Sequence, residues 1–344
     1  MSAVDSTAPV EGDVVLRDFR FASGETLPEL RLHYRTFGTL VRDAEGTATN
    51  AVLILHGTGG SGAQFIRPEF SERLFAVGGL LDATKYYLVL PDGIGHGASS
   101  KPSDGLRARF PAYGYRDMID AQHRLLTEGL GVDHLRLVMG TSMGGMHSWL
   151  WGQLHPRFMD ALMPLASLPG QISGRNRAWR RVIIDVVRND PAWQGGDYVE
   201  QPPLSSRVAT QMIWLMSSNA VLRQAQMPTL AEADTLLDMP GTLAKTPVDV
   251  NDLLYQIEAS RDYDPAPGLE RIVAPLVAVN FADDLINPPE LGILERGIVE
   301  VARGEAVVIA SSEATCGHGT HTVAEVWEPY LSELLNRSNS KVAA

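Results

Sequence analysis

The sequence predicts an α/β fold, with a mostly parallel, doubly wound sheet and a helical cap insertion. Short apolar runs alternate with helical patterns along the chain, which is typical of such sheets. Most runs from residue 51 onward are continuously hydrophobic, as expected for parallel strands covered on both faces. A long helical segment, residues 170–265, interrupts the alternation and forms the predicted insertion.

Eight strands are expected, at residues 14–21, 30–37, 51–55, 86–90, 135–139, 161–165, 275–279 and 306–310. The first two alternate apolar and polar residues more than the others, which suits antiparallel strands at an edge of the sheet. Four helices are expected around the later strands, at residues 115–130, 143–155, 288–302 and 322–336.

The segment 170–265 has no convincing strand and is rich in Trp and Met. We expect it to fold over the carboxyl edge of the sheet as a cap, with residues 1–169 and 266–344 forming the two parts of the core. Some Trp and Met side chains are expected to line an apolar pocket. The alternative is that they form an ordinary helical core, and both descriptions can hold together.

Composition excludes several functional classes. The 29 Lys and Arg residues stand against 41 Asp and Glu, a net charge of −12, and no basic run suits nucleic acid. Cys316 is the only cysteine, so no intrachain disulfide can form, which fits a reducing compartment. Neither a signal peptide nor an apolar membrane span is recognisable. We therefore expect a cytoplasmic protein without nucleic-acid or membrane partners.

The strongest chemical signal is a serine between two glycines, in the run Gly140-Thr-Ser-Met-Gly144. This run follows an expected strand and precedes an expected helix. Such a tight strand-to-helix turn exposes the serine, and the helix N-terminus behind it favours negative charge. Ser142 is therefore the predicted nucleophile, with a plain tight turn as the alternative.

A nucleophilic serine needs a base, and the base needs a group that orients it. The acid should follow the strand 275–279, where Asp283 and Asp284 are both available, and we prefer Asp284. The base should follow the strand 306–310, where glycines flank His318. His321 is expected to open the last helix. A metal site at the two histidines lacks further ligands and is not expected.

A glycine-rich loop, residues 56–62, follows the strand 51–55. Glycines there would let backbone amides approach a substrate carbonyl. We predict an oxyanion hole formed by the backbone N–H groups of Thr58 and Met143. The loop lacks the sequence features of the common phosphate-binding motifs, so phosphate binding is not favoured.

Four other polar residues are expected to have structural roles. Asp92 and His96 lie in a loop on the ligand side of the sheet, His147 lies on the helix behind Ser142, and Cys316 is taken as a small loop residue.

With these residues in hand, the chain resembles the α/β-hydrolase superfamily and, more narrowly, the homoserine O-acetyltransferase family of acetyltransferases and esterases. The resemblance rests on residues 140–146, 189–198, 284–290 and 317–318. It implies Ser142, Asp284 and His318 as the catalytic triad, and a homodimer. The loops 56–60 and 93–100 depart from the usual acetyltransferase pattern.

We therefore expect a serine hydrolase that cleaves short-chain acyl esters through an acyl-enzyme and requires neither cofactor nor metal. The alternative within the same chemistry is an acetyl-CoA-dependent O-acetyltransferase acting on homoserine or a related alcohol. A cap arginine would then hold the amino-acid carboxylate, and four are candidates: Arg177, Arg180, Arg181 and Arg188. A non-catalytic binding protein on the same fold is the alternative from a different class.

Overall fold

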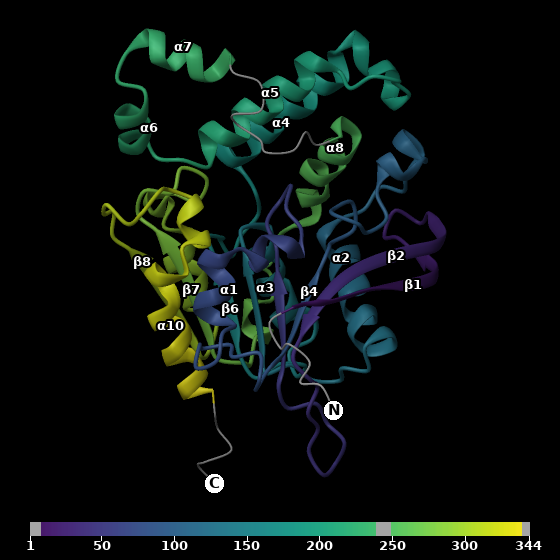
Figure 1. The fold of residues 1–344 in the computed structure, drawn as a ribbon, viewed down its shortest axis with the longest axis vertical. Coiled ribbons are helices and arrows are strands. Elements are labelled where there is room, and N and C mark those ends of the chain that lie inside the picture. Colours follow the sequence, from purple (N-terminus) through teal and green to yellow (C-terminus); the bar gives the residue numbers. More distant parts are fainter. Residues whose placement is uncertain (1–7, 239–248, 339–344) are drawn as a thin grey trace.

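The fold is built on one eight-stranded sheet (Figure 1), in which neighbouring strands follow the order β1-β2-β4-β3-β5-β6-β7-β8. The computed structural model describes residues 8–238 and 249–338. The strands are Val10–Arg20 (β1), Thr26–Phe37 (β2), Ala51–Leu55 (β3), Tyr87–Pro91 (β4), Leu137–Thr141 (β5), Leu162–Leu165 (β6), Leu276–Phe281 (β7) and Gly304–Ile309 (β8). The pairs β1–β2 and β2–β4 are antiparallel, and every other neighbouring pair is parallel. The predicted fold class, with its antiparallel edge, is confirmed.

Helices cover both faces of the sheet, and each face has its own hydrophobic core. On one face lie Tyr115–Arg124 (α2), Met143–Leu154 (α3) and Ile293–Ile298 (α9); on the other lie Pro68–Leu74 (α1) and Ala324–Arg337 (α10). Strands β3 and β5 are fully buried between these layers, which explains their continuous hydrophobicity.

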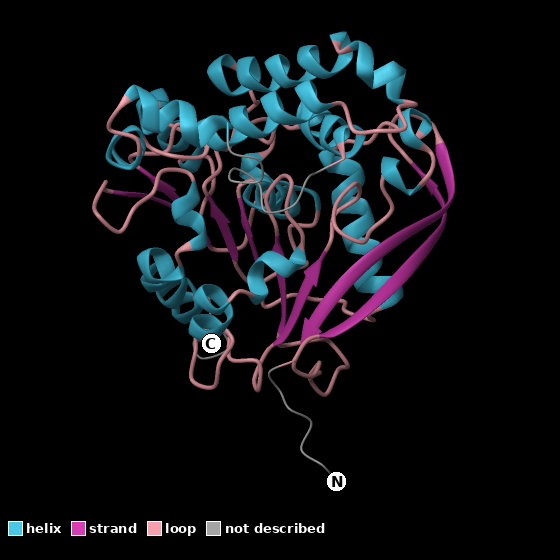
Figure 2. Ribbon diagram, turned by 45° about the horizontal axis from the view of Figure 1, so that its top comes forward, coloured by secondary structure: helices cyan, strands magenta, loops and turns pink. Residues whose placement is uncertain are grey.

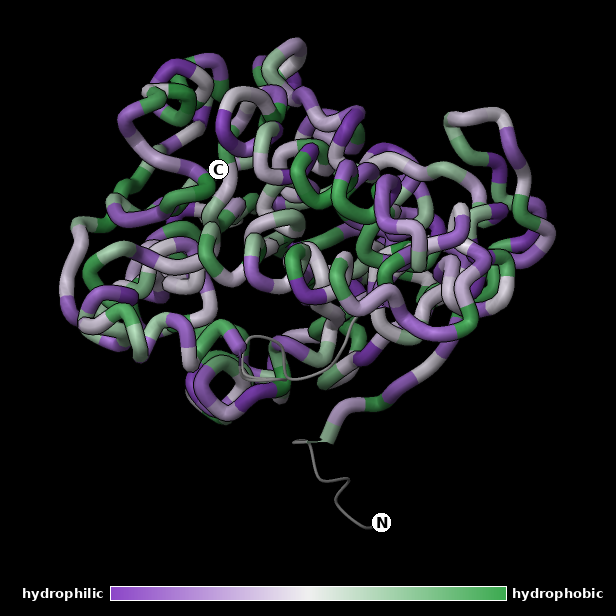
Figure 3. The backbone as a smooth tube through the Cα atoms, turned by 90° about the horizontal axis from the view of Figure 1, so that it is seen from above, coloured by the Kyte–Doolittle hydropathy of each residue, from purple (hydrophilic) through white to green (hydrophobic). Residues whose placement is uncertain are grey.

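Between β6 and β7 the chain forms the helices of the cap, which lie above one end of the sheet (Figures 1 and 2). They are Gly174–Asn189 (α4), Pro203–Met216 (α5), Ala220–Gln226 (α6), Leu230–Asp238 (α7) and Val250–Glu258 (α8). Hydrophobic and hydrophilic residues are interspersed along the tube in Figure 3, and the apolar faces of α4, α5 and α8 form a third core. Within the described residues, no helix is both long and apolar enough to cross a membrane.

Two helices differ from the sequence analysis. The helix expected at 288–302 is shorter, because Gly292 adopts the left-handed conformation (φ 59°) and separates the 3₁₀ turn Pro289–Leu291 from α9. Helix α1 was not expected. It is seven residues long and begins at Pro68, so it is too short for a clear helical period.

Candidate active site

Ser142 occupies the sharp turn between β5 and α3. Its backbone (φ 57°, ψ −111°) lies in a region that residues with a side chain rarely adopt, and its amide donates to the Leu165 carbonyl at 2.9 Å. A Cβ on Gly144 would lie 2.0 Å from the Leu55 carbonyl oxygen, and one on Gly140 would lie 2.2 Å from that of Gly144. Only glycines therefore allow the helix to begin so close to the strands.

The imidazole of His318 lies between Ser142 and Asp284. Its Nε2 is 2.8 Å from the Ser142 Oγ, and its Nδ1 is 2.7 Å from the Asp284 Oδ2. An ionised carboxylate can only accept, so it selects the tautomer with the proton on Nδ1. Nε2 is then free to accept the serine proton. Asp284 and His318 are buried, whereas Ser142 is half-buried.

Asp284 is held as an anion by several donors besides His318. Its Oδ1 accepts hydrogen bonds from the amides of Ile286 (2.7 Å) and Asn287 (3.1 Å), and its Oδ2 also accepts from the Asn287 side chain (3.2 Å). Burial raises the pKa of this carboxyl, but the His318 imidazole and the amides outweigh burial and hold the pKa below its ordinary value. Asn287 has no role in the sequence analysis, although its spacing of three residues from Asp284 suits such a turn.

The two alternative residues have different partners. Among the described residues, Asp283 makes no hydrogen bond to the imidazole, and its Oδ2 accepts one from the Gly317 amide at 2.9 Å. The ring of His321 lies 5.2 Å from the His318 ring, and its Nδ1 has no partner among the described residues. Burial lowers the pKa of His321 to about 3, so this imidazole is neutral near pH 7.

The glycine-rich loop 56–62 lies against Ser142. A Cβ on Gly57 would be 3.4 Å from the Ser142 Cβ and 3.9 Å from its Oγ. Met143 is the first residue of α3, so its amide belongs to the free N–H groups of the helix start. Within the described part of the chain, neither this amide nor that of Thr58 donates to another atom. Both are available to a ligand.

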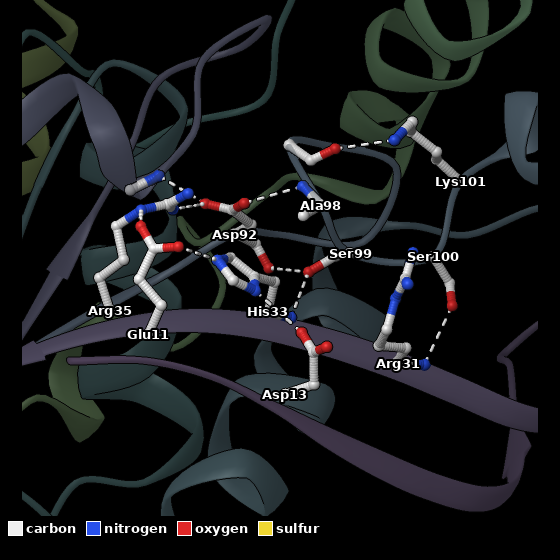
Figure 4. Close-up of polar contacts among 12 residues, drawn as sticks. Glu11, Asp13, Arg31, His33, Arg35, Asp92, Ala98, Ser99, Ser100 and Lys101 are labelled. Carbon is white, nitrogen blue, oxygen red and sulfur yellow. Dashed lines mark hydrogen bonds and ion pairs between the residues drawn. The ribbon is translucent and has the colours of Figure 1, made fainter.

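The far end of this loop is held by Asp92 (Figure 4). The Asp92 carboxylate is fully buried and accepts hydrogen bonds from the Gly62 amide (2.7 Å), the Arg35 guanidinium (2.9 Å) and the Ala98 amide (2.9 Å). Arg35 lies on β2 and also donates to Glu11 on β1. Asp92 therefore joins the glycine-rich loop to the antiparallel edge of the sheet, and among the described residues it makes no hydrogen bond to Ser142, Asp284 or His318.

The remaining candidate residues, His96, His147 and Cys316, make no hydrogen bond to Ser142, His318 or Asp284 within the described residues. His96 contacts the Ile94 carbonyl through Nδ1, and burial lowers its pKa well below the ordinary value. His147 lies 3.2 Å from the Gln122 side chain, and burial lowers its pKa to about 3. Burial raises the pKa of the half-buried Cys316 thiol, which disfavours a thiolate.

A cavity of about 500 Å³ lies beside Asp284. Its walls include Met146, Leu168 and Tyr263, whereas Ser142 and His318 are not among its lining residues. The expected contribution of cap Trp and Met residues is not found at this cavity among the described residues. Trp179, for example, packs in the core of the cap instead.

The sequence is similar to known enzymes of one family. Residues 50–291 match the family model described as the alpha/beta hydrolase fold. The homoserine O-acetyltransferase of Pelobacter propionicus is 30% identical over 315 residues, which cover 81% of this chain and 83% of that protein.

Solved structures agree on the fold. Esterase E22 matches with a TM-score of 0.82 at 17% identity, over 95% of this chain and all of that chain. The homoserine O-acetyltransferase of Bacillus anthracis matches with a TM-score of 0.79 at 21% identity, over 96% and 98% of the two chains. The chain therefore belongs to the α/β-hydrolase family and, within it, to the enzymes that resemble homoserine O-acetyltransferases.

Proposed function

We propose that this enzyme hydrolyses short-chain carboxylic esters through an acyl-enzyme on Ser142. The observation that carries the proposal is the unbroken line of hydrogen bonds from the Ser142 hydroxyl through His318 to the buried Asp284. A serine beside an imidazole that is oriented by a carboxylate is equipped for acyl transfer.

In the proposed first step, the Ser142 Oγ attacks the ester carbonyl carbon while the His318 Nε2 takes the hydroxyl proton. Asp284 stabilises the resulting imidazolium through Nδ1. The amides of Thr58 and Met143 donate to the oxyanion, and each such donor contributes about 3 kcal/mol of transition-state stabilisation. His318 then returns the proton to the leaving alcohol, and the acyl group remains on Ser142.

In the second step, water replaces the alcohol. His318 takes a proton from the water molecule as its oxygen attacks the acyl carbon, and the proton returns to the Ser142 Oγ when the acid leaves. The same two amides hold the second oxyanion. The net reaction consumes one ester and one water and yields one alcohol and one acid.

The test is hydrolysis of p-nitrophenyl acetate by the wild type and by Ser142→Ala. We expect the variant to lose activity by at least about a thousandfold, because the acyl-enzyme cannot form. Ser148→Ala is the matched control, since Ser148 is a buried serine of α3 whose hydroxyl, within the described residues, bonds only the Gly144 carbonyl. Full activity of a pure Ser142→Ala sample would refute the assignment.

One observation favours acetyl transfer to a carboxylate-bearing alcohol as the second candidate function. Arg180 is 3% exposed; its guanidinium hydrogen-bonds the Asn176 and Ser260 side chains and lies over the Trp179 ring, with no carboxylate partner among the described residues. Burial lowers its pKa, and it lies near the Tyr115 hydroxyl, which in turn lies near Thr58. A buried cation is costly without a counter-ion, and a substrate carboxylate would supply one.

The other candidate arginines are less suited to this role. Arg181 and Arg188 are exposed and pair with Asp185 and Glu258, whereas Arg177 is half-buried. Homoserine carries the required carboxylate, and it is the acceptor named for the acetyltransferase relatives.

Thiol release from acetyl-CoA, with and without homoserine, separates the two functions. Release that depends on homoserine, and a raised KM for homoserine in Arg180→Gln, would establish acetyl transfer. Fast ester hydrolysis without acceptor-dependent thiol release would establish the esterase.

A further inference from the structure

His318 is carried by a loop whose backbone is held on both sides of the histidine. The amide of Gly317, before it, donates to the Asp283 Oδ2 at 2.9 Å. The amide of Gly319, after it, donates to the Ser217 carbonyl at 3.2 Å. The imidazole therefore depends on two anchors that lie outside its own loop, one after β7 and one in the cap.

The cap anchor is the corner between α5 and α6, residues 217–219. Ser218 and Asn219 are buried although they connect two helices. A Cβ on Gly317, which has a φ of 71°, would lie 2.6 Å from the Ser218 carbonyl carbon. The corner therefore packs directly on the backbone of the histidine loop, with no room for a side chain between them.

Asp283, the first anchor, is itself bonded to the second, the cap corner. The same Oδ2 that accepts from Gly317 accepts from the Asn219 amide at 2.7 Å, and the Thr315 hydroxyl lies 3.0 Å away. The other end of the Asn219 side chain is also fixed, because its Oδ1 accepts from the Leu222 amide and caps α6. Hydrogen bonds to an ionised carboxylate are about twice as strong as neutral ones, so the contacts of Asp283 hold the cap corner and the histidine loop together strongly.

We propose that Asp283 is a positioning residue, through which the corner 217–219 of the cap sets the alignment of His318. The inference rests on the proposed hydrolysis at Ser142. The two adjacent carboxylates then have different roles: Asp284 orients the imidazole ring, and Asp283 orients the loop that carries the ring. A displacement of the cap corner moves the base away from Ser142, so cap position regulates the chemical step.

The test compares Asn219→Ser, Asp283→Ala and Asp283→Asn in p-nitrophenyl acetate hydrolysis. Serine keeps a helix-capping oxygen at position 219 but removes the amide that reaches Asp283. We expect Asn219→Ser and Asp283→Ala to lower kcat about tenfold with KM nearly unchanged. This loss is smaller than the roughly hundredfold loss in rate that a 1 Å misplacement of a catalytic group can cause. Asp283→Asn keeps an acceptor oxygen and should lose less.

The matched control is Asn189→Ser, which removes the side-chain amide of another cap asparagine; in the described part of the chain that amide bonds only the Asp185 carbonyl of its own helix. Its kcat should equal that of the wild type. The double variant Asn219→Ser, Asp283→Ala should be no slower than Asp283→Ala alone, since both remove the same contact. Wild-type kcat in folded Asn219→Ser and Asp283→Ala, or multiplicative losses in the double variant, would overturn the proposal.

A second readout does not require substrate turnover. The proton that His318 shares with Asp284 should give a low-field NMR resonance, assigned by its loss in Asp284→Ala. We expect it to shift or broaden in Asn219→Ser and Asp283→Ala but not in Asn189→Ser. An unchanged resonance would contradict the positioning role, whereas a wild type without esterase activity but with these NMR effects would refute only the proposed function.

Discussion

Asp283 and Asp284 are neighbours in one loop, yet their carboxylates have separate sets of partners. Asp284 is 1% exposed and bonds the imidazole and the amides of its own turn. Asp283 is half-buried and bonds groups from the histidine loop and the cap. Substitution of one carboxylate should therefore affect the chemistry differently from substitution of the other.

Asp284→Asn should lower kcat for p-nitrophenyl acetate by about 10⁴-fold, the loss known for the equivalent change in a serine protease triad. The amide would stabilise the wrong imidazole tautomer and could not balance the imidazolium charge. Steady-state kinetics with Asp283→Asn as the control measures the difference. Equal losses in the two variants would show that the assignment of the acid is wrong.

Local sequence motifs predict the three side chains at the centre of the site, but not the residues that hold those side chains in place. Ser142, Asp284 and His318 each stand in a short, recognisable turn, and the structure brings these three side chains together. Asn219 reaches the site only because the cap folds back onto the histidine loop, some hundred residues later in the chain. No local pattern reports a contact of this kind.

At the scale of the elements, α3 is the helix on which the site depends. It contacts β3, β5 and β6, and its residues from Met143 to Gln153 are all buried. Its first two glycines, Gly144 and Gly145, face backbone: a Cβ on Gly145 would lie 2.4 Å from the Leu165 carbonyl oxygen. A backbone carbonyl cannot rotate away as a side chain can, so this face of α3 tolerates no added atom.

Gly144→Ala should therefore lower the free energy of unfolding by about 3 kcal/mol, at the upper end of the usual cost of overpacking. Urea unfolding followed by circular dichroism measures the change. Gly170→Ala is the control, because its Cβ would meet only a methyl group of Ile293, at 3.2 Å. Equal stability of the two variants would show that α3 can move away from β3.

Sequence periodicity located the strands to within a few residues, because burial on both faces leaves a clear hydrophobic signal. It was least successful for α1 and α9, whose lengths of seven and six residues give less than two helical turns. The conformation of Gly292 decides where α9 begins, and a glycine in the sequence does not reveal its φ.

At the scale of the whole molecule, the core holds several neutral imidazoles. Burial lowers the pKa of four histidine rings around the site: His56, His96, His147 and the half-buried His321. In the unfolded chain each would titrate near 6.5. The stability that these neutral rings confer is complete above pH 6.5, and it is lost progressively as the pH falls toward the lowered values.

The free energy of unfolding should consequently fall between pH 6.5 and pH 5, by up to about 1.4 kcal/mol per pH unit for each histidine. Asp252 opposes this trend, because burial raises its pKa to about 6 and its contribution decreases as the pH rises toward that value. Urea unfolding of the wild type and of His147→Phe should show a shallower pH slope in the variant. Above pH 7.5 the two slopes should coincide, and identical slopes at pH 5–6 would contradict the account.

The ion pair between Asp92 and Arg35 links the glycine-rich loop to a part of the molecule that takes no part in the chemistry. Arg35 belongs to β2, in the antiparallel pair at the open edge of the sheet, and edge pairs are among the first elements to open by local unfolding. Fraying of that edge would leave a buried carboxylate without its cation and release the Gly62 amide. Mild denaturant would then switch the enzyme off while most of the sheet still resists hydrogen exchange, so loss of activity would report on the edge strands rather than on global unfolding.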